Sequence, residues 1–151
     1  MDKTDIILDE PLQSNKIDKL GADLCKAQAE IKGVKANSVN PHFSSNYADI
    51  FAVIETAISV LAKNGLSFTQ GSDFIDNHFF VTTRLIHKSG QWIESKLMMP
   101  IKDRQGKVTP HSVGSAMTYG RRYGLSAMIG IGQYDDDGNV GSLKTNKMED
   151  F

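Results

Sequence analysis

The chain has 151 residues, of which 40% are hydrophobic and 23% charged, and its formal net charge is -1. This length favours a single domain that buries enough surface to be stable without a disulfide or a metal ion. The single cysteine, Cys25, excludes an internal disulfide, there is no run of 18 apolar residues to span a membrane, and the acidic start lacks a signal peptide, so we expect a cytoplasmic protein.

The first predicted elements are two amphipathic helices. Residues 1–12 read as a flexible arm. A helix then follows from Ser14, a plausible N-cap, to a stop at Gly33, because apolar residues recur there at three- and four-residue steps. Residues 35–47 are rich in Asn, Ser and Pro and predict a loop. A second apolar stripe predicts a helix over 48–64, which an Asn-Gly pair ends.

The hydrophobic period then changes to two, which predicts strands. A short strand covers 66–70, a turn follows at 72–77, and longer strands cover 78–87 and 92–101 on either side of a hairpin turn. The third strand has two faces, with Ile93, Leu97, Met99 and Ile101 on one and Trp92, Glu94, Lys96 and Met98 on the other.

The last predicted element is a glycine-containing helix from Thr109 to Gly130. Gly120 and Gly124 fall at the centre of its apolar face, and a glycine inside a helix costs roughly 1 kcal/mol relative to alanine. We therefore predict that the backbone approaches the sheet closely at both positions. Arg122 points to the opposite side among further apolar residues, which indicates that something covers that side, a neighbouring subunit being one candidate.

This order of elements predicts an α+β fold, in which helices flank a three-stranded antiparallel β-meander in the order α-α-β-β-β-α. The predicted core domain spans residues 13–132. Residues 133–151, with five acidic residues and two lysines, form an acidic C-terminal tail.

Although the net charge of the whole chain is close to zero, its middle segment is basic. Residues 82–122 carry eight basic and two acidic residues, a local net charge of +6. Such a segment suits a polyanion if the fold gathers the charges on one face. The basic residues are Arg84, Lys88, Lys96, Lys102, Arg104, Lys107, Arg121 and Arg122.

Three stretches together resemble one family: NPHFSSNYADIFAVIETAISVLAKNGLSF, VTTRLIHKSGQWIESKLMMPI and PHSVGSAMTYGRRYGLSAMIGI, the last followed by DDDGN. Over residues 40–139 the chain is similar to the Erf family, the phage essential-recombination-function proteins that anneal complementary DNA strands. The resemblance implies a core like that of the eukaryotic Rad-fifty-two annealing protein, rings or helical filaments, a basic groove for single-stranded DNA, and no ATP or other cofactor. It also implies that residues 119–123 form the basic helix motif and residues 41–47 an aromatic loop.

The candidate DNA-binding residues follow from charge, aromatic character and this resemblance. Lysine and arginine neutralise phosphates, and aromatic rings stack bases without reading sequence. The phosphate candidates are Lys96, Lys102, Arg104, Lys107, Arg121 and Arg122, and the stacking candidates are Tyr47, Trp92, Tyr119 and Tyr123. The expected partners are single-stranded DNA and further copies of the chain. The ending KMEDF resembles the acidic tip of bacterial single-strand-binding proteins, which makes such a host protein, or its partners, another candidate.

Two other functions fit the sequence. A passive cover protein would bind single strands and oligomerise without annealing them. A magnesium-dependent nuclease would use Glu94 and Lys96, which lie two residues apart on one strand, together with Asp73 or Asp76.

Overall fold

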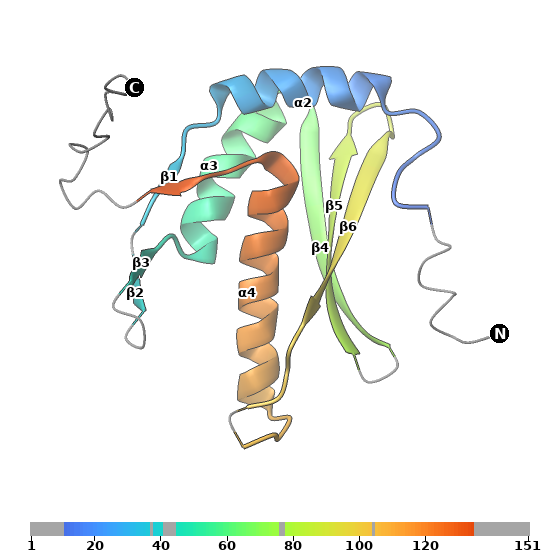
Figure 1. Cartoon of the computed structure of the whole chain (residues 1–151). Helices are drawn as coiled ribbons and strands as arrows, with labels where there is room; N and C mark the ends of the chain where they lie inside the picture. Colours follow the sequence, from blue (N-terminus) through green and yellow to red (C-terminus); the bar gives the residue numbers. More distant parts are fainter. Residues whose placement is uncertain (1–10, 37, 41–44, 76–77, 104, 135–151) are drawn as a thin grey trace, which may run out of the picture.

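The computed structural model describes residues 11–36, 38–40, 45–75, 78–103 and 105–134. Within these ranges the long elements follow the predicted order, two helices, three strands and a helix, so the α+β class and the three-stranded antiparallel sheet are confirmed (Figure 1). The elements are α2 (Asp18–Glu30), β1 (Val34–Lys35), β2 (Ser38–Asn40), β3 (Ser45–Tyr47), α3 (Ile50–Lys63), β4 (Leu66–Ile75), β5 (His78–His87), β6 (Trp92–Met99), α4 (Pro110–Ile129) and β7 (Gln133–Tyr134).

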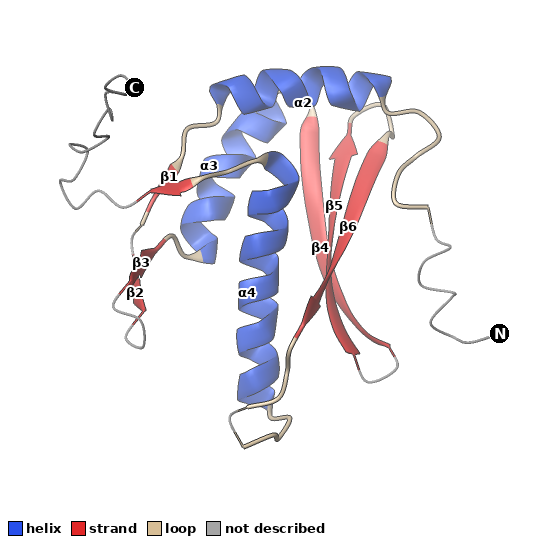
Figure 2. Ribbon diagram, in the orientation of Figure 1, coloured by secondary structure: helices blue, strands red, loops and turns tan. Residues whose placement is uncertain are grey.

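The main sheet has the order β4-β5-β6, and both pairings are antiparallel (Figure 2). On the central strand, alternate residues from Phe79 to His87 are buried, as the period of two predicts. Their neighbours, such as Thr82 and Arg84, point to the other face. The helices pack on the first face, and α2 crosses the upper end of the sheet in the view of Figure 1.

The two central glycines of α4 lie directly against β5. A Cβ atom at Gly120 would be 2.5 Å from Cγ2 of Val81, and one at Gly124 would be 2.6 Å from Oγ1 of Thr83. A methyl group at either position would force neighbouring atoms to shift. The predicted close approach of helix and sheet is therefore confirmed.

The ends of α4 are also as predicted. Thr109 is the N-cap, and its hydroxyl accepts a hydrogen bond from the Ser112 amide at 3.1 Å while the Ser112 hydroxyl accepts one from the Thr109 amide at 2.9 Å. This reciprocal capping box satisfies two amides that the helix leaves without intrahelical acceptors. At the other end Gly130 adopts the left-handed conformation, with φ of 74°, that stops a helix.

The side of α4 that carries Arg122 is covered by α3 of the same chain. Arg122 is 6% exposed, and Leu125 and Ile129 are fully buried. The last two belong to one hydrophobic cluster with Val53 and Ala57 of α3. A neighbouring subunit is therefore not needed to explain the apolar residues there.

The first helix begins later than predicted, because Ser14 has another role. Ser14 pairs with β6: its amide donates to the Trp92 carbonyl at 2.9 Å, and the Trp92 amide donates to its hydroxyl at 3.0 Å. The helix α2 instead begins at Asp18 after Ile17, which makes no side-chain cap. It ends at Glu30, before the predicted stop, and the chain continues into β1.

The strand prediction was too short at one place and missed four short strands. β4 continues to Ile75, through part of the predicted turn, because it pairs along its whole length with β5. The predicted loop over 35–47 contains β2 and β3, which pair with each other, and the end of β1, which pairs in parallel with β7. Strands of two or three residues are too short to show a period.

A group of polar side chains fastens α2 to the sheet. Asp23 lies 2.8 Å from Nζ of Lys26 and 3.0 Å from Nε2 of the buried His87. The hydrogen bond from Lys26, followed by that from His87, lowers the pKa of Asp23 to about 2. Because His87 belongs to β5, this contact joins the helix to the central strand.

The predicted arm over 1–12 and the acidic tail over 133–151 fall mostly outside the described residues. At the N-terminal side, the Leu12 carbonyl accepts a hydrogen bond from the Glu94 amide at 2.7 Å. No helix in the described ranges is both long and apolar enough to cross a membrane.

Candidate nucleic-acid interface

A groove of about 690 Å³ runs between the exposed side of α4 and the segment that follows β6. After β6 ends at Met99 the chain makes a loop and then forms α4 from Pro110. The groove lies between this helix and the segment that leads into the loop. Its lining is more apolar than polar. The lining residues are Met99, Pro100, Lys102, Asp103, Gln105, His111, Ser112, Ser115, Ala116, Tyr119 and Tyr123.

Two tyrosines give the groove its aromatic wall. Tyr119 and Tyr123 are four residues apart on α4, so they lie on one side of the helix. Their ring centroids are 5.9 Å apart with an interplanar angle of 35°, and the residues are 38% and 45% exposed. Tyrosines usually keep most of their ring buried, so two exposed rings side by side can accept flat ligands.

Arg122 supports these rings from inside the protein. Its guanidinium carbon lies 4.9 Å from the ring centroid of Tyr119 and 4.8 Å from that of Tyr123, and Nη2 donates a hydrogen bond to the Tyr123 hydroxyl at 3.0 Å. Its charge in the sequence predicts a phosphate contact, whereas in the structure Arg122 is buried and its guanidinium lies beside the two rings.

The loop on the other side of the groove presents cations. Asp103 accepts hydrogen bonds from the amides of Gln105 and Lys107, both at 2.8 Å, so its carboxylate is held within its own loop. Lys102 and Lys107 are exposed, and Lys102 lines the groove opposite the tyrosines. Asp103 also lines the groove, so at this wall the ammonium group of Lys102 stands beside a carboxylate.

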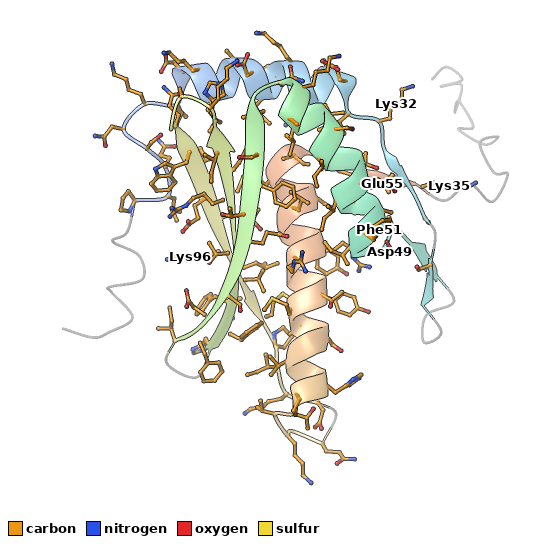
Figure 3. The ribbon with its side chains drawn as sticks, turned by 180° about the vertical axis from the view of Figure 1, so that it is seen from behind. Lys32, Lys35, Asp49, Phe51, Glu55 and Lys96 are labelled. Atoms are coloured by element: carbon orange, nitrogen blue, oxygen red, sulfur yellow. The ribbon has the colours of Figure 1, made fainter. Side chains whose placement is uncertain are left out.

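Of the remaining candidates that the structure describes, Lys96, Lys107 and Arg121 are not among the residues that line the groove. Arg121 lies two residues and therefore about 200° around α4 from Tyr119, with its Nε 3.5 Å from Oε1 of Gln70. Lys96 projects from the sheet face that no described helix covers (Figure 3). Tyr47 belongs to β3 but its side chain, like all of Arg104, lies outside what the structure describes.

A second hollow, of about 460 Å³, lies on that uncovered sheet face and contains the residues of the nuclease hypothesis. Asp73, Glu94 and Lys96 all line it, as the strand register predicts. However, the Glu94 carboxylate lies 2.6 Å from Nε of Arg84, and its side chain is 8% exposed, so an arginine already neutralises it. The described residues hold no group of three or more metal-binding side chains, and Asp76 lies outside them.

Several residues that line the groove are not among the candidates predicted from the sequence. Ser112 and Ser115 precede Tyr119 and Tyr123 at steps of three and four, so helical spacing was an available signal. They carry neither charge nor a ring, and for that reason composition did not select them. Met99 and Pro100 were assigned to the third strand, and only the path of the chain brings them beside α4.

These observations define a class: a small α+β domain whose helix and neighbouring loop form a tyrosine-lined groove with a lysine at its rim. The family model described as the ERF superfamily matches residues 21–150, and the chain belongs to this family. At the family level, this membership associates the chain with phage-type recombination by single-strand annealing, and the family's proteins are annealing proteins that are not known as enzymes. No curated protein and no solved structure gives a significant match, so the likeness to the Rad-fifty-two core stays a prediction.

Proposed function

We propose that this chain binds single-stranded DNA in the groove beside α4 and anneals complementary strands as an oligomeric ring or filament, without ATP. The observation that carries the proposal is the pair of exposed tyrosine rings 5.9 Å apart, facing a wall that bears Lys102. Family membership supports the proposed annealing activity. The groove is the basis for proposing where on the molecule the strand binds.

Each part of the groove has a physical role in this proposal. The rings of Tyr119 and Tyr123 stack against bases, and each such contact contributes about 1–3 kcal/mol whatever the base. Lys102 and Lys107 neutralise phosphates and release bound counterions, so affinity falls as salt rises. Neither kind of contact uses the hydrogen-bonding edges of the bases. A second strand therefore finds those edges available for pairing.

One protomer offers too few contacts to hold a strand alone. When several protomers assemble, one strand crosses many copies of the same weak site, and each further contact becomes intramolecular. This is why the proposal includes an oligomer. The core over 13–132 suffices for the groove, and the acidic tail over 133–151 is proposed as the segment that reaches a host single-strand-binding protein or its partners.

An annealing assay with matched variants tests the proposal. We expect Y119A and Y123A each to weaken the binding of fluorescent oligothymidylate about tenfold to a hundredfold, and to slow the pairing of complementary strands. K102A should weaken binding to all sequences and flatten its dependence on salt concentration. K96A, which removes a lysine from the other face of the sheet, is the matched control and should have the smaller effect. Equal effects of K102A and K96A would argue against the groove.

The same assay separates the alternatives. A passive cover protein would bind the oligonucleotides but slow their pairing relative to protein-free DNA. A nuclease would shorten labelled DNA when Mg²⁺ is added, and E94A would abolish the cleavage. Acceleration of pairing with intact DNA is the result that the proposal expects.

A further inference from the structure

The first feature is an exposed aromatic side chain on α3. Phe51 is 69% exposed, although the opposite side of the same helix is buried through Val53, Ala57 and Leu61. Glu55 follows one helical turn later, so a carboxylate lies beside the ring (Figure 3). Leaving a phenylalanine in water forgoes a large hydrophobic stabilisation, which makes Phe51 a candidate contact residue.

The second feature is an apolar hollow of about 250 Å³ at the lower end of the sheet. Its lining includes Met98, Pro100, Ile101 and Lys102. Met98 is 57% exposed. A cavity of about 150 Å³ holds a benzene ring, so this hollow has room for one phenylalanine side chain.

The two features are complementary in chemistry and separate in position. An aromatic ring beside a carboxylate matches an apolar hollow beside an ammonium group, since Glu55 and Lys102 are both exposed and opposite in charge. Phe51 lies on α3 and the hollow lies at the ends of β5 and β6, with α4 between them (Figure 1). Phe51 therefore cannot fill the hollow of its own chain.

We infer that Phe51 of one protomer inserts into the Met98–Lys102 hollow of the next copy of this chain, with Glu55 paired to Lys102. This interface deepens the proposed function, which requires assembly, and rests on it in that respect. Because the two surfaces lie on opposite sides of α4, one protomer uses them toward two different neighbours. Such a head-to-tail contact repeats into a closed ring or an open filament. It also places each groove, which shares Lys102 with the hollow, next to the interface.

The experiment measures assembly without DNA, by sedimentation velocity and mass photometry of the full chain. We expect the wild type to form oligomers, and F51A and M98E each to weaken association at least tenfold. I58A is the matched control: Ile58 is a similarly exposed apolar residue on the same helix, 53% exposed and two turns from Phe51. It should assemble like the wild type. All the substituted residues are exposed, and circular dichroism checks that each variant is folded.

Mixing the variants gives the sharpest result. F51A keeps an intact hollow and M98E keeps an intact Phe51, so a mixture should form one-to-one pairs that neither variant forms alone. In addition, E55K and K102E should each weaken assembly, and the double variant should restore it. A monomeric wild type, full assembly of F51A, or equal losses for F51A and I58A would overturn the interface. Because Phe51 and Met98 do not line the groove, binding of a short oligonucleotide to F51A and M98E reports on the groove separately, so failure of the interface is distinguishable from failure of the proposed function.

Discussion

Replacing a helical glycine by alanine usually stabilises a protein, but the packing of α4 against the sheet predicts the opposite effect at Gly120. Gly120→Ala in an exposed helix would stabilise the protein by about 1 kcal/mol. Here the new Cβ would lie 2.5 Å and 2.9 Å from two atoms of Val81 and 3.0 Å from Cγ of Met99. Overpacking costs about 1–3 kcal/mol, and contacts this short favour the upper end. We therefore expect a net loss of about 2 kcal/mol in the free energy of unfolding.

Urea denaturation at one fixed protein concentration measures this loss, and a thermal melt should show a fall of about 4–8 °C. Gly114→Ala is the matched control, because it lies in the same helix with no atom within 4 Å of the new Cβ. It should gain roughly 1 kcal/mol. The double variant Gly120→Ala with Val81→Ala should be more stable, by more than about 1 kcal/mol, than the sum of the two single losses predicts, because the two residues are in contact. A Gly120→Ala protein as stable as the Gly114→Ala protein would refute the close-packing explanation.

Three further predictions concern the N-cap of α4, the contact that joins Asp23 of α2 to His87 of the sheet, and the groove. Thr109→Ala removes the capping box of α4 and should cost about 1 kcal/mol in urea denaturation; an unchanged midpoint would contradict that role. Hydrogen bonds from Lys26 and then His87 lower the pKa of Asp23 to about 2, so its contribution to stability is complete above its ordinary pKa of 3.8 and is lost as pH falls through about 2. The stability difference between wild type and D23N should therefore shrink between about pH 4 and about pH 2, and a constant difference would contradict the linkage. R122K keeps the charge but loses the planar group beside the two tyrosine rings, and should weaken oligothymidylate binding about tenfold with an unchanged salt slope; wild-type affinity would show that Arg122 does not position the rings.

The features that local sequence determines were predicted well. The capping residue and the stop of α4 were correct because each acts through its nearest neighbours in the chain. The close approach at Gly120 and Gly124 was predictable because two glycines at the centre of an apolar helix face leave room for a neighbouring strand and cost helix stability unless that room is filled. The alternation along β5 was equally clear.

The errors arise where distant segments decide the outcome. Ser14 has the residue type of an N-cap, yet pairing with β6 uses its hydroxyl. Helical geometry predicted which side of α4 carries Arg122. It could not predict that α3 packs on that side. The groove itself depends on the loop after Met99 returning beside Tyr119, which no spacing in the sequence encodes. Charge counts gathered Lys96 and Lys102 into one basic segment, whereas the sheet places them on different surfaces.

Photo-crosslinking of oligothymidylate to the wild-type protein, followed by mass spectrometry of the peptides, tests the central claim most directly. If single-stranded DNA lies in the groove, the crosslinked peptides contain Tyr119 and Tyr123 and the loop around Lys102, and excess unlabelled oligonucleotide removes the adducts. Adducts confined to the uncovered sheet face around Trp92 and Lys96, or no adducts at low salt, would contradict the account.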